Sequence, residues 1–161
     1  MKRDGCQMNK TMERRLWNDL RCGKSNYEIL QTLRPEAKSA VLAVPYLLEY
    51  AAQTEWQWGM TLDDQFLAGM AIEPDILPRR AWFCAYPSEL LTNPFLIRPL
   101  FKLFNDMKRL GPYDEIRAWV IDGAEREERF AAWFGFVLDC GPASGYSPTG
   151  EDMNLWIWRR T

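Results

Sequence analysis

The catalytic chemistry open to this chain is limited first by the complete absence of histidine. Ser-His-Asp triads, Cys-His pairs and His-metal sites all need an imidazole, so these arrangements are excluded. Any general base must therefore be a carboxylate, a lysine, a tyrosine or a bound water molecule. The acidic clusters are Asp63-Asp64 and the group Glu125, Glu127 and Glu128. Adjacent acids on a helix point in different directions, so we interpret these clusters as solvated faces and not as metal sites.

The cysteines and one glycine-containing loop offer no stronger motif. The four cysteines, at positions 6, 22, 84 and 140, are far apart and form no C-x-x-C pair. We therefore predict no metal site, and free thiols in a reducing compartment. The loop CGPASGYSPTG over 140–150 lies between two predicted strands and lacks the Lys-Ser/Thr ending of a phosphate-binding P-loop. It is predicted to be a flexible connection.

Length and charge narrow the class of protein. The chain has 161 residues, 47% of them apolar, and a formal net charge of −2. That length suits a single domain, and the charge lacks the basic excess typical of nucleic-acid binding. No window approaches the roughly 20 apolar residues of a membrane span. The polar start has no apolar signal-peptide core, so we expect no secretion by that route.

Helical and strand patterns alternate along the chain. We predict strands over 27–33, 66–72, 81–86, 115–121, 136–139 and 153–158, and helices over 9–21, 35–44, 46–54, 96–110 and 125–134. The helix over 96–110 has a wide apolar face that must lie against a sheet. Trp56 and Trp58 are placed in a short irregular stretch, with their rings over the edge of the core. This order predicts an α/β fold, with a mixed sheet of about six strands and helices on both faces.

The N-terminal segment, residues 1–25, is predicted to be an amphipathic helical extension of a domain that spans 26–161. Apolar residues recur every four positions in it, and residues 1–24 carry seven basic against three acidic side chains. The helix either packs on its own domain or docks on a partner. In the second case Met12, Leu16, Trp17 and Leu20 are the candidate partner-binding residues.

The C-terminal half, from Arg80 to Arg159, resembles the GNAT N-acetyltransferase superfamily. The resemblance lies in the strand AWFCAY, the long helix, the strand IRAWVIDG, the segment EREERFAAWFGF and the ending MNLWIWRR. It implies a GNAT-like fold, with acetyl-coenzyme A as the cofactor of an active member. The combination of LRPE, AGMAIEP, RRAWFCAY and AAWFGF is also similar to a GNAT-fold family of tailed phages, whose members are labelled internal virion or virion-associated proteins.

Two departures from the superfamily pattern bear on activity. The superfamily holds the diphosphate of coenzyme A on a loop Arg/Gln-x-x-Gly-x-Gly/Ala before the long helix, whereas this sequence reads SELLTNPFLIRPL. That stretch has no glycine, and Pro94 and Pro99 lack the N–H groups that would bind phosphate. We therefore expect no cofactor, and Thr92, Asn93 and Arg98 remain the only candidates for contacting one.

The second departure concerns the general acid. The superfamily often has a tyrosine four residues before the glycine of Gly-Phe, where it protonates the departing thiolate. The matching position here is Ala131, which has no proton to give. Tyr86 and Tyr146 are the available substitutes.

These features predict a non-catalytic phage virion-associated or interaction protein, in the host cytoplasm or the virion, that binds a protein such as a virion component. The alternative is a coenzyme A-dependent N-acyltransferase that acts on a small amine or a protein amine. Its cleft would lie between the AWFCAY and IRAWVI strands. A nucleic-acid binder is disfavoured by the charge.

Overall fold

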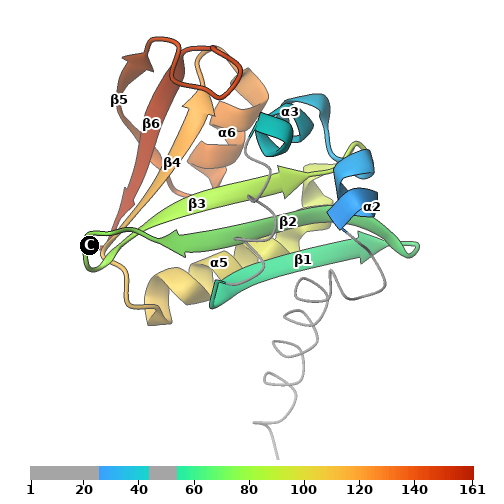
Figure 1. Ribbon diagram of the computed structural model, residues 1–161. Helices are drawn as coiled ribbons and strands as arrows, with labels where there is room; N and C mark the ends of the chain where they lie inside the picture. The colour runs from blue at the N-terminus through green and yellow to red at the C-terminus, as the bar shows by residue number, and fades with distance from the viewer. Residues whose placement is uncertain (1–25, 44–53) are drawn as a thin grey trace, which may run out of the picture.

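The computed structural model describes residues 26–43 and 54–161 (Figure 1). The elements are α2 (Asn26–Thr32), α3 (Pro35–Ala43), β1 (Trp56–Leu62), β2 (Gln65–Pro74), β3 (Arg80–Pro87), the 3-10 turn η1 (Pro94–Ile97), α5 (Arg98–Leu110), β4 (Glu115–Ile121), α6 (Glu125–Trp133), β5 (Val137–Ala143) and β6 (Met153–Arg159). The predicted N-terminal helix, with Met12, Leu16, Trp17 and Leu20, lies outside the described residues. So does the predicted helix over 46–54, apart from its last residue.

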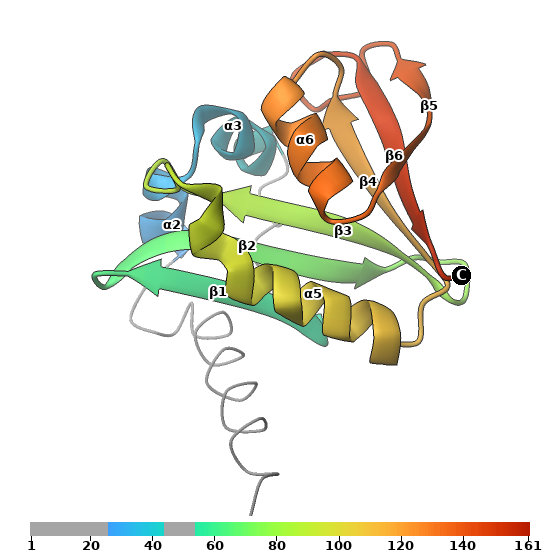
Figure 2. The ribbon, with the colours of Figure 1, turned by 180° about the vertical axis from the view of Figure 1, so that it is seen from behind.

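The six strands form one mixed sheet in the order β1-β2-β3-β4-β6-β5. Every neighbouring pair is antiparallel except β3 and β4, which run parallel because α5 crosses over between them. Helices α5 and α6 cover one face of the sheet, and α2 and α3 lie on the other (Figures 1 and 2). The predicted α/β architecture, with a mixed sheet and helices on both faces, is confirmed.

The main core lies between the sheet and the apolar face of α5. Leu100, Leu103, Phe104 and Met107 recur at helical spacing and are buried. The Phe104 ring contacts aromatic rings from other elements, with Phe83 of β3 at 5.2 Å between centroids. The wide apolar face predicted for the long helix is therefore buried as expected.

A smaller core on the opposite face corrects one prediction. Residues 27–33 were expected to form a strand, but Asn26–Thr32 is a helix and only Leu33 makes a bridge, to Ser88. Ile29 and Leu33 are four residues apart, so a helix places both on one face, and both are buried with Phe66. The apolar residues of the short stretch YEILQTL fit both the period of a strand and that of a helix. The stretch is helical because a helix buries Ile29 and Leu33 together.

The stretch around the two tryptophans was also predicted wrongly. It is not irregular but forms the edge strand β1, paired with β2 from Trp56↔Ile72 to Leu62↔Gln65. Trp58 is buried in the main core, and Trp56 packs against it half-buried. Their predicted role of covering the core is confirmed. Gln57, between the two tryptophans, is also buried, so the first half of this strand is covered on both faces.

Strand β5 is longer than predicted. It continues through Cys140 to Ala143, where a loop was expected, and its pairing with β6 is irregular on both sides of Cys140.

In the part of the chain that the structure describes, no helix is long and apolar enough to cross a membrane.

Candidate functional site

The parallel strands β3 and β4 separate shortly after they pair. They are matched only from Arg80↔Glu115 to Trp82↔Arg117, and beyond these residues the two strands diverge (Figure 1). From that point the facing edges of the two strands share no ladder hydrogen bonds, so the sheet opens into two halves.

Glu115 holds the closed end of this opening together. Its carboxylate accepts hydrogen bonds from Arg117 at 2.6 Å and Arg159 at 3.1 Å, and it lies 3.5 Å from Arg80. Burial raises the pKa of this carboxyl, but the hydrogen bonds from the two arginines outweigh burial and leave the pKa below its usual range. The carboxylate therefore ties β3, β4 and β6 together as an anion.

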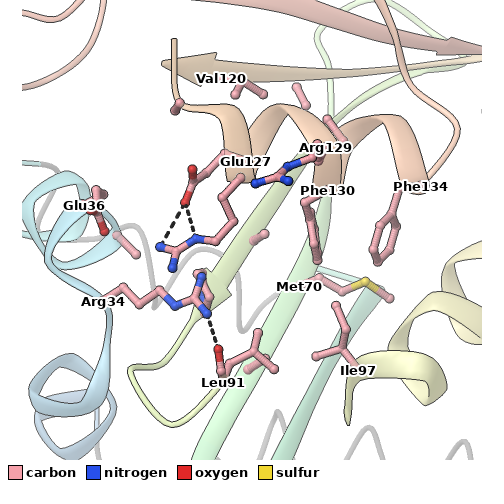
Figure 3. A pocket seen from close by; sticks show the side chains of 18 of the residues that line it. Arg34, Glu36, Met70, Leu91, Ile97, Val120, Glu127, Arg129, Phe130 and Phe134 are labelled. Carbon is pink, nitrogen blue, oxygen red and sulfur yellow. Dashed lines mark hydrogen bonds and ion pairs between the residues drawn. The ribbon is translucent and has the colours of Figure 1, made fainter. Parts of the chain in front are cut away.

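A cavity of about 1070 Å³ fills the space between the diverging strands. Its walls come from β2, β3, β4, α6, the start of α5 and the start of α3 (Figure 3). The wall residues are mostly apolar: Met70, Phe83, Ala85, Leu91, Ile97, Leu100, Ala118, Val120, Phe130, Ala131, Phe134 and Phe136. The site is thus a deep apolar cleft, the usual character of a small-molecule site.

The charged groups of the cleft come from helices α3 and α6 and from the segments that join α2 to α3 and β3 to η1. Among the described residues, the ionisable side chains that line it are Arg34, Glu36, Glu89, Arg126, Glu127 and Arg129. Lysine, tyrosine and cysteine are absent from this described lining. The site therefore offers carboxylates that can accept a proton, but no side chain that readily donates one near neutral pH.

The turn before α5 uses its amides internally. Leu91 N–H donates to Ser88 O at 3.2 Å, and Thr92 N–H donates to Leu90 O at 2.9 Å. Phe95 N–H donates to the side chain of Asn93, and Leu96 N–H to its carbonyl oxygen. The row of free amides that would bind a diphosphate is therefore not presented by these residues.

The three residues near this turn that were candidates for contacting a cofactor lie in different positions. Thr92 lines the cleft. The Asn93 side chain caps η1 through Phe95 N–H at 3.0 Å, and the guanidinium of Arg98 lies over the Phe95 ring at 4.6 Å. Neither Asn93 nor Arg98 is among the cleft-lining residues.

Arg34 binds the carbonyl oxygens of this turn. Its Nε donates to Ser88 O at 3.2 Å, and its Nη2 donates to Leu91 O. Burial, and next the charge of Arg126, lower the pKa of Arg34. Sequence reasoning missed this residue as part of the site; the only signal was a basic side chain directly before the proline that begins α3.

The general-acid candidates also lie outside the cleft lining. Tyr86 is buried on the opposite face of the sheet, in the small core with Ile29 and Leu33. Tyr146 is 59% exposed and packs on Trp119, with ring centroids 4.5 Å apart. Ala131, the position matched to the superfamily tyrosine, does line the cleft. No group of three potential metal ligands occurs among residues 26–43 and 54–161.

No protein-family description matches the chain, and no curated protein sequence matches it. Solved structures do match. One is the ribosomal L7/L12 α-N-protein acetyltransferase RimL in complex with coenzyme A, at 14% identity and a TM-score of 0.52. The match covers 64% of this chain and 60% of RimL, less than two thirds of that protein.

Two further matches cover more of the chain. A candidate phosphinothricin N-acetyltransferase matches at 9% identity and a TM-score of 0.59, over 85% of this chain and 95% of its own. The Campylobacter jejuni N-acetyltransferase PseH in complex with acetyl coenzyme A matches at 11% identity and a TM-score of 0.50, over 73% of this chain and 77% of its own. None of the three is described as a virion protein, so the resemblance to a phage family gains no support. With its mixed sheet, splayed parallel pair and covering helices, the chain has the fold of the GNAT acetyltransferases.

Proposed function

We propose that the cleft binds a coenzyme A thioester and that the protein transfers its acyl group to an amine. The observation that carries this proposal is the cavity of about 1070 Å³ between the diverging strands β3 and β4. This volume is slightly above the usual range for ligand sites, roughly 300–1,000 Å³. It suits a long cofactor arm together with an acyl group. Structures of the same fold hold coenzyme A or acetyl coenzyme A.

The edges of β3 and β4 that no longer pair with each other explain why a coenzyme A thioester would bind in this cleft. Beyond Trp82 and Arg117 the two strands no longer pair with each other, so their backbone groups face the cleft. Unpaired backbone groups favour an extended ligand that carries amides, which adds to a strand edge as another strand would. The pantetheine arm of coenzyme A is such a ligand, and the apolar walls suit its methylene and methyl groups.

The lining residues support direct transfer to the amine. The neutral amine nitrogen attacks the thioester carbonyl, a C–N bond forms, and the C–S bond breaks to release coenzyme A as a thiolate. Glu36, Glu89 and Glu127 are the described lining groups that can accept the amine proton. Because the described lining has no tyrosine, cysteine or lysine, the thiolate takes its proton from water.

A second candidate function is a non-catalytic interaction protein on the same fold. Two observations favour it: the turn before α5 has its amides engaged within the turn, and Ala131 stands where the superfamily acid would be. A protein partner, such as a virion component, would then bind through surfaces that include Met12, Leu16, Trp17 and Leu20. Under this second candidate function, the chain is a phage protein that is located in the virion or in the host cytoplasm.

Product analysis separates the two. The full chain is incubated with acetyl-coenzyme A and a panel of polyamines, amino acids and peptides with free N-termini, and the amines are examined by mass spectrometry. We expect at least one amine to gain an acetyl group. If no amine is acetylated while acetyl-coenzyme A still binds, transferase activity is ruled out for that panel and the non-catalytic function is favoured.

Two alanine positions give a matched pair of variants. Ala85 is exposed and lines the cleft, so Ala85→Trp fills the cleft without disturbing the core. Ala132 is exposed on α6 and is not among the residues lining the cleft, so Ala132→Trp adds the same bulk elsewhere. Transfer should be lost in Ala85→Trp and kept in Ala132→Trp.

A further inference from the structure

Charged and apolar side chains gather at opposite ends of the cleft. In Figure 3, Arg34, Glu36 and Glu127 lie on one side of it, and Ile97 and Phe134 lie on the other. We call the charged end the mouth, and we define it by the ionisable side chains of the described lining: Arg34, Glu36, Glu89, Arg126, Glu127 and Arg129. Three of these groups are cations and three are anions, so their formal charges cancel.

The closed end of the cleft is built from apolar side chains. It begins where the pairing of β3 and β4 stops, and Phe83 and Ala118 line it there. The Phe83 ring packs against those of Phe134 and Phe136, with ring centroids 5.6 and 5.5 Å apart. The strands β2, β3, β4 and β6 contribute no charged, hydroxyl or amide side chain to the described lining. A polar ligand group would lose its hydrogen bonds with water here and find no side chain to replace them.

Small side chains leave space beside these rings. Ala118 on β4 and Ala131 on α6 are buried and line the cleft. Ala131 lies one helical turn before Phe134, on the same side of the helix. Both positions leave part of the cavity of about 1070 Å³ open to a ligand. Hydrocarbon that moves from water into such a space favours binding by roughly fourfold for each methylene group.

We propose that the closed end of the cleft binds the hydrocarbon chain of an acyl group longer than acetyl. This inference rests on the proposed function and names its donor class, a medium-chain acyl thioester of coenzyme A. The amine nitrogen attacks the acyl carbonyl, the C–N bond forms, and the C–S bond breaks. A carboxylate of the mouth takes the amine proton, and coenzyme A leaves as the thiolate, which water protonates. An acetyl group is too short to fill the apolar end, whereas a longer chain covers the rings of Phe83 and Phe134.

The test is calorimetric titration of the full chain with acetyl-coenzyme A and, separately, with hexanoyl-coenzyme A. Each thioester is also incubated with the panel of amines, and acylated products are identified by mass spectrometry. Ala118→Leu and Ala131→Leu each fill the closed end from a different element. Ala132→Leu is the matched control, because Ala132 is exposed on α6 and is not among the residues lining the cleft. Thermal unfolding checks that each variant remains folded.

We expect hexanoyl-coenzyme A to bind the wild-type chain about tenfold or more tightly than acetyl-coenzyme A. This ratio should fall in Ala118→Leu and Ala131→Leu and stay unchanged in Ala132→Leu. Equal binding of the two thioesters by the wild type, or a ratio that both filled variants keep, overturns the chain pocket.

The two proposals fail in different ways. Tighter binding of hexanoyl-coenzyme A without any acylated amine leaves the chain pocket standing and removes the transferase function. Acetyl transfer without any preference for the hexanoyl group removes the chain pocket and leaves the transferase function standing. If neither thioester binds, both are overturned.

Discussion

Cys84 lies beside Glu73 and Tyr86 on the sheet face covered by α2 and α3. Burial, and next the charge of Glu73, raise the pKa of the Cys84 thiol far above its usual range. Cys140, by contrast, is exposed on β5. Because only the thiolate is nucleophilic, we expect iodoacetamide at neutral pH to alkylate Cys140 and spare Cys84 in the native chain. Peptide mass spectrometry reads each site separately. Both should react in urea, and equal rates in the native chain would contradict the raised pKa of the half-buried Cys84.

Glu115 gives a prediction about pH. Its folded pKa is lowered, so its contribution is fully present above the unfolded pKa of about 4.3 and is lost as pH falls through the lower folded value. At pH 7 Glu115→Gln should lower the free energy of unfolding by about 1 kcal/mol. Urea unfolding of both proteins at several pH values measures the difference. It should shrink in acid; a difference that grows below about pH 4 would contradict the ionic role.

For individual residues, the sequence predicted some members of the cleft and missed others. Ala131 was identified by its spacing from Gly135-Phe136, and it does line the cleft. Arg34 was missed, because its role depends on carbonyl oxygens 54 and 57 residues away in sequence. Periodicity and spacing carry no information about such contacts.

Among the elements, α5 contributes four buried residues to the main core. Phe104 is fully buried against rings from β3 and from residues 134 and 136. Phe104→Ala should therefore lower the free energy of unfolding by about 3–5 kcal/mol, measured by urea denaturation. Leu110, at the end of the same helix, is 62% exposed, and Leu110→Ala should cost much less, about 0.5 kcal/mol. Equal effects would mean that this helix face is not packed as described.

The strength of the local pattern explains which elements could be predicted. The predicted helix over 96–110 has a clear helical period, and the predicted strands over 81–86 and 115–121 are apolar runs between loops. The structure has them as α5, β3 and β4. Helix α2 is seven residues long, and its apolar residues suit a strand almost equally well. Its contact with Phe66 and Tyr86, which lie far along the chain, decides between the two.

For the whole molecule, the cleft follows from the topology of the sheet. A single parallel pair joins the half formed by β1, β2 and β3 to the half formed by β4, β6 and β5. That pair is short, so the halves diverge, and α5 and α6 close the space behind them (Figure 2). The resemblance to GNAT proteins indicated a cleft between these two strands. Its size and its arginine-lined mouth depend on where the pairing stops, which the sequence does not reveal.

The most direct test of the proposed function is calorimetric titration of the full chain with acetyl-coenzyme A. A cofactor cleft predicts one binding site with a dissociation constant on the order of micromolar, abolished by Ala85→Trp and retained by Ala132→Trp. Absence of binding to the wild-type chain up to about 1 mM, or unchanged binding by Ala85→Trp, would contradict the assignment of the cleft to a coenzyme A thioester.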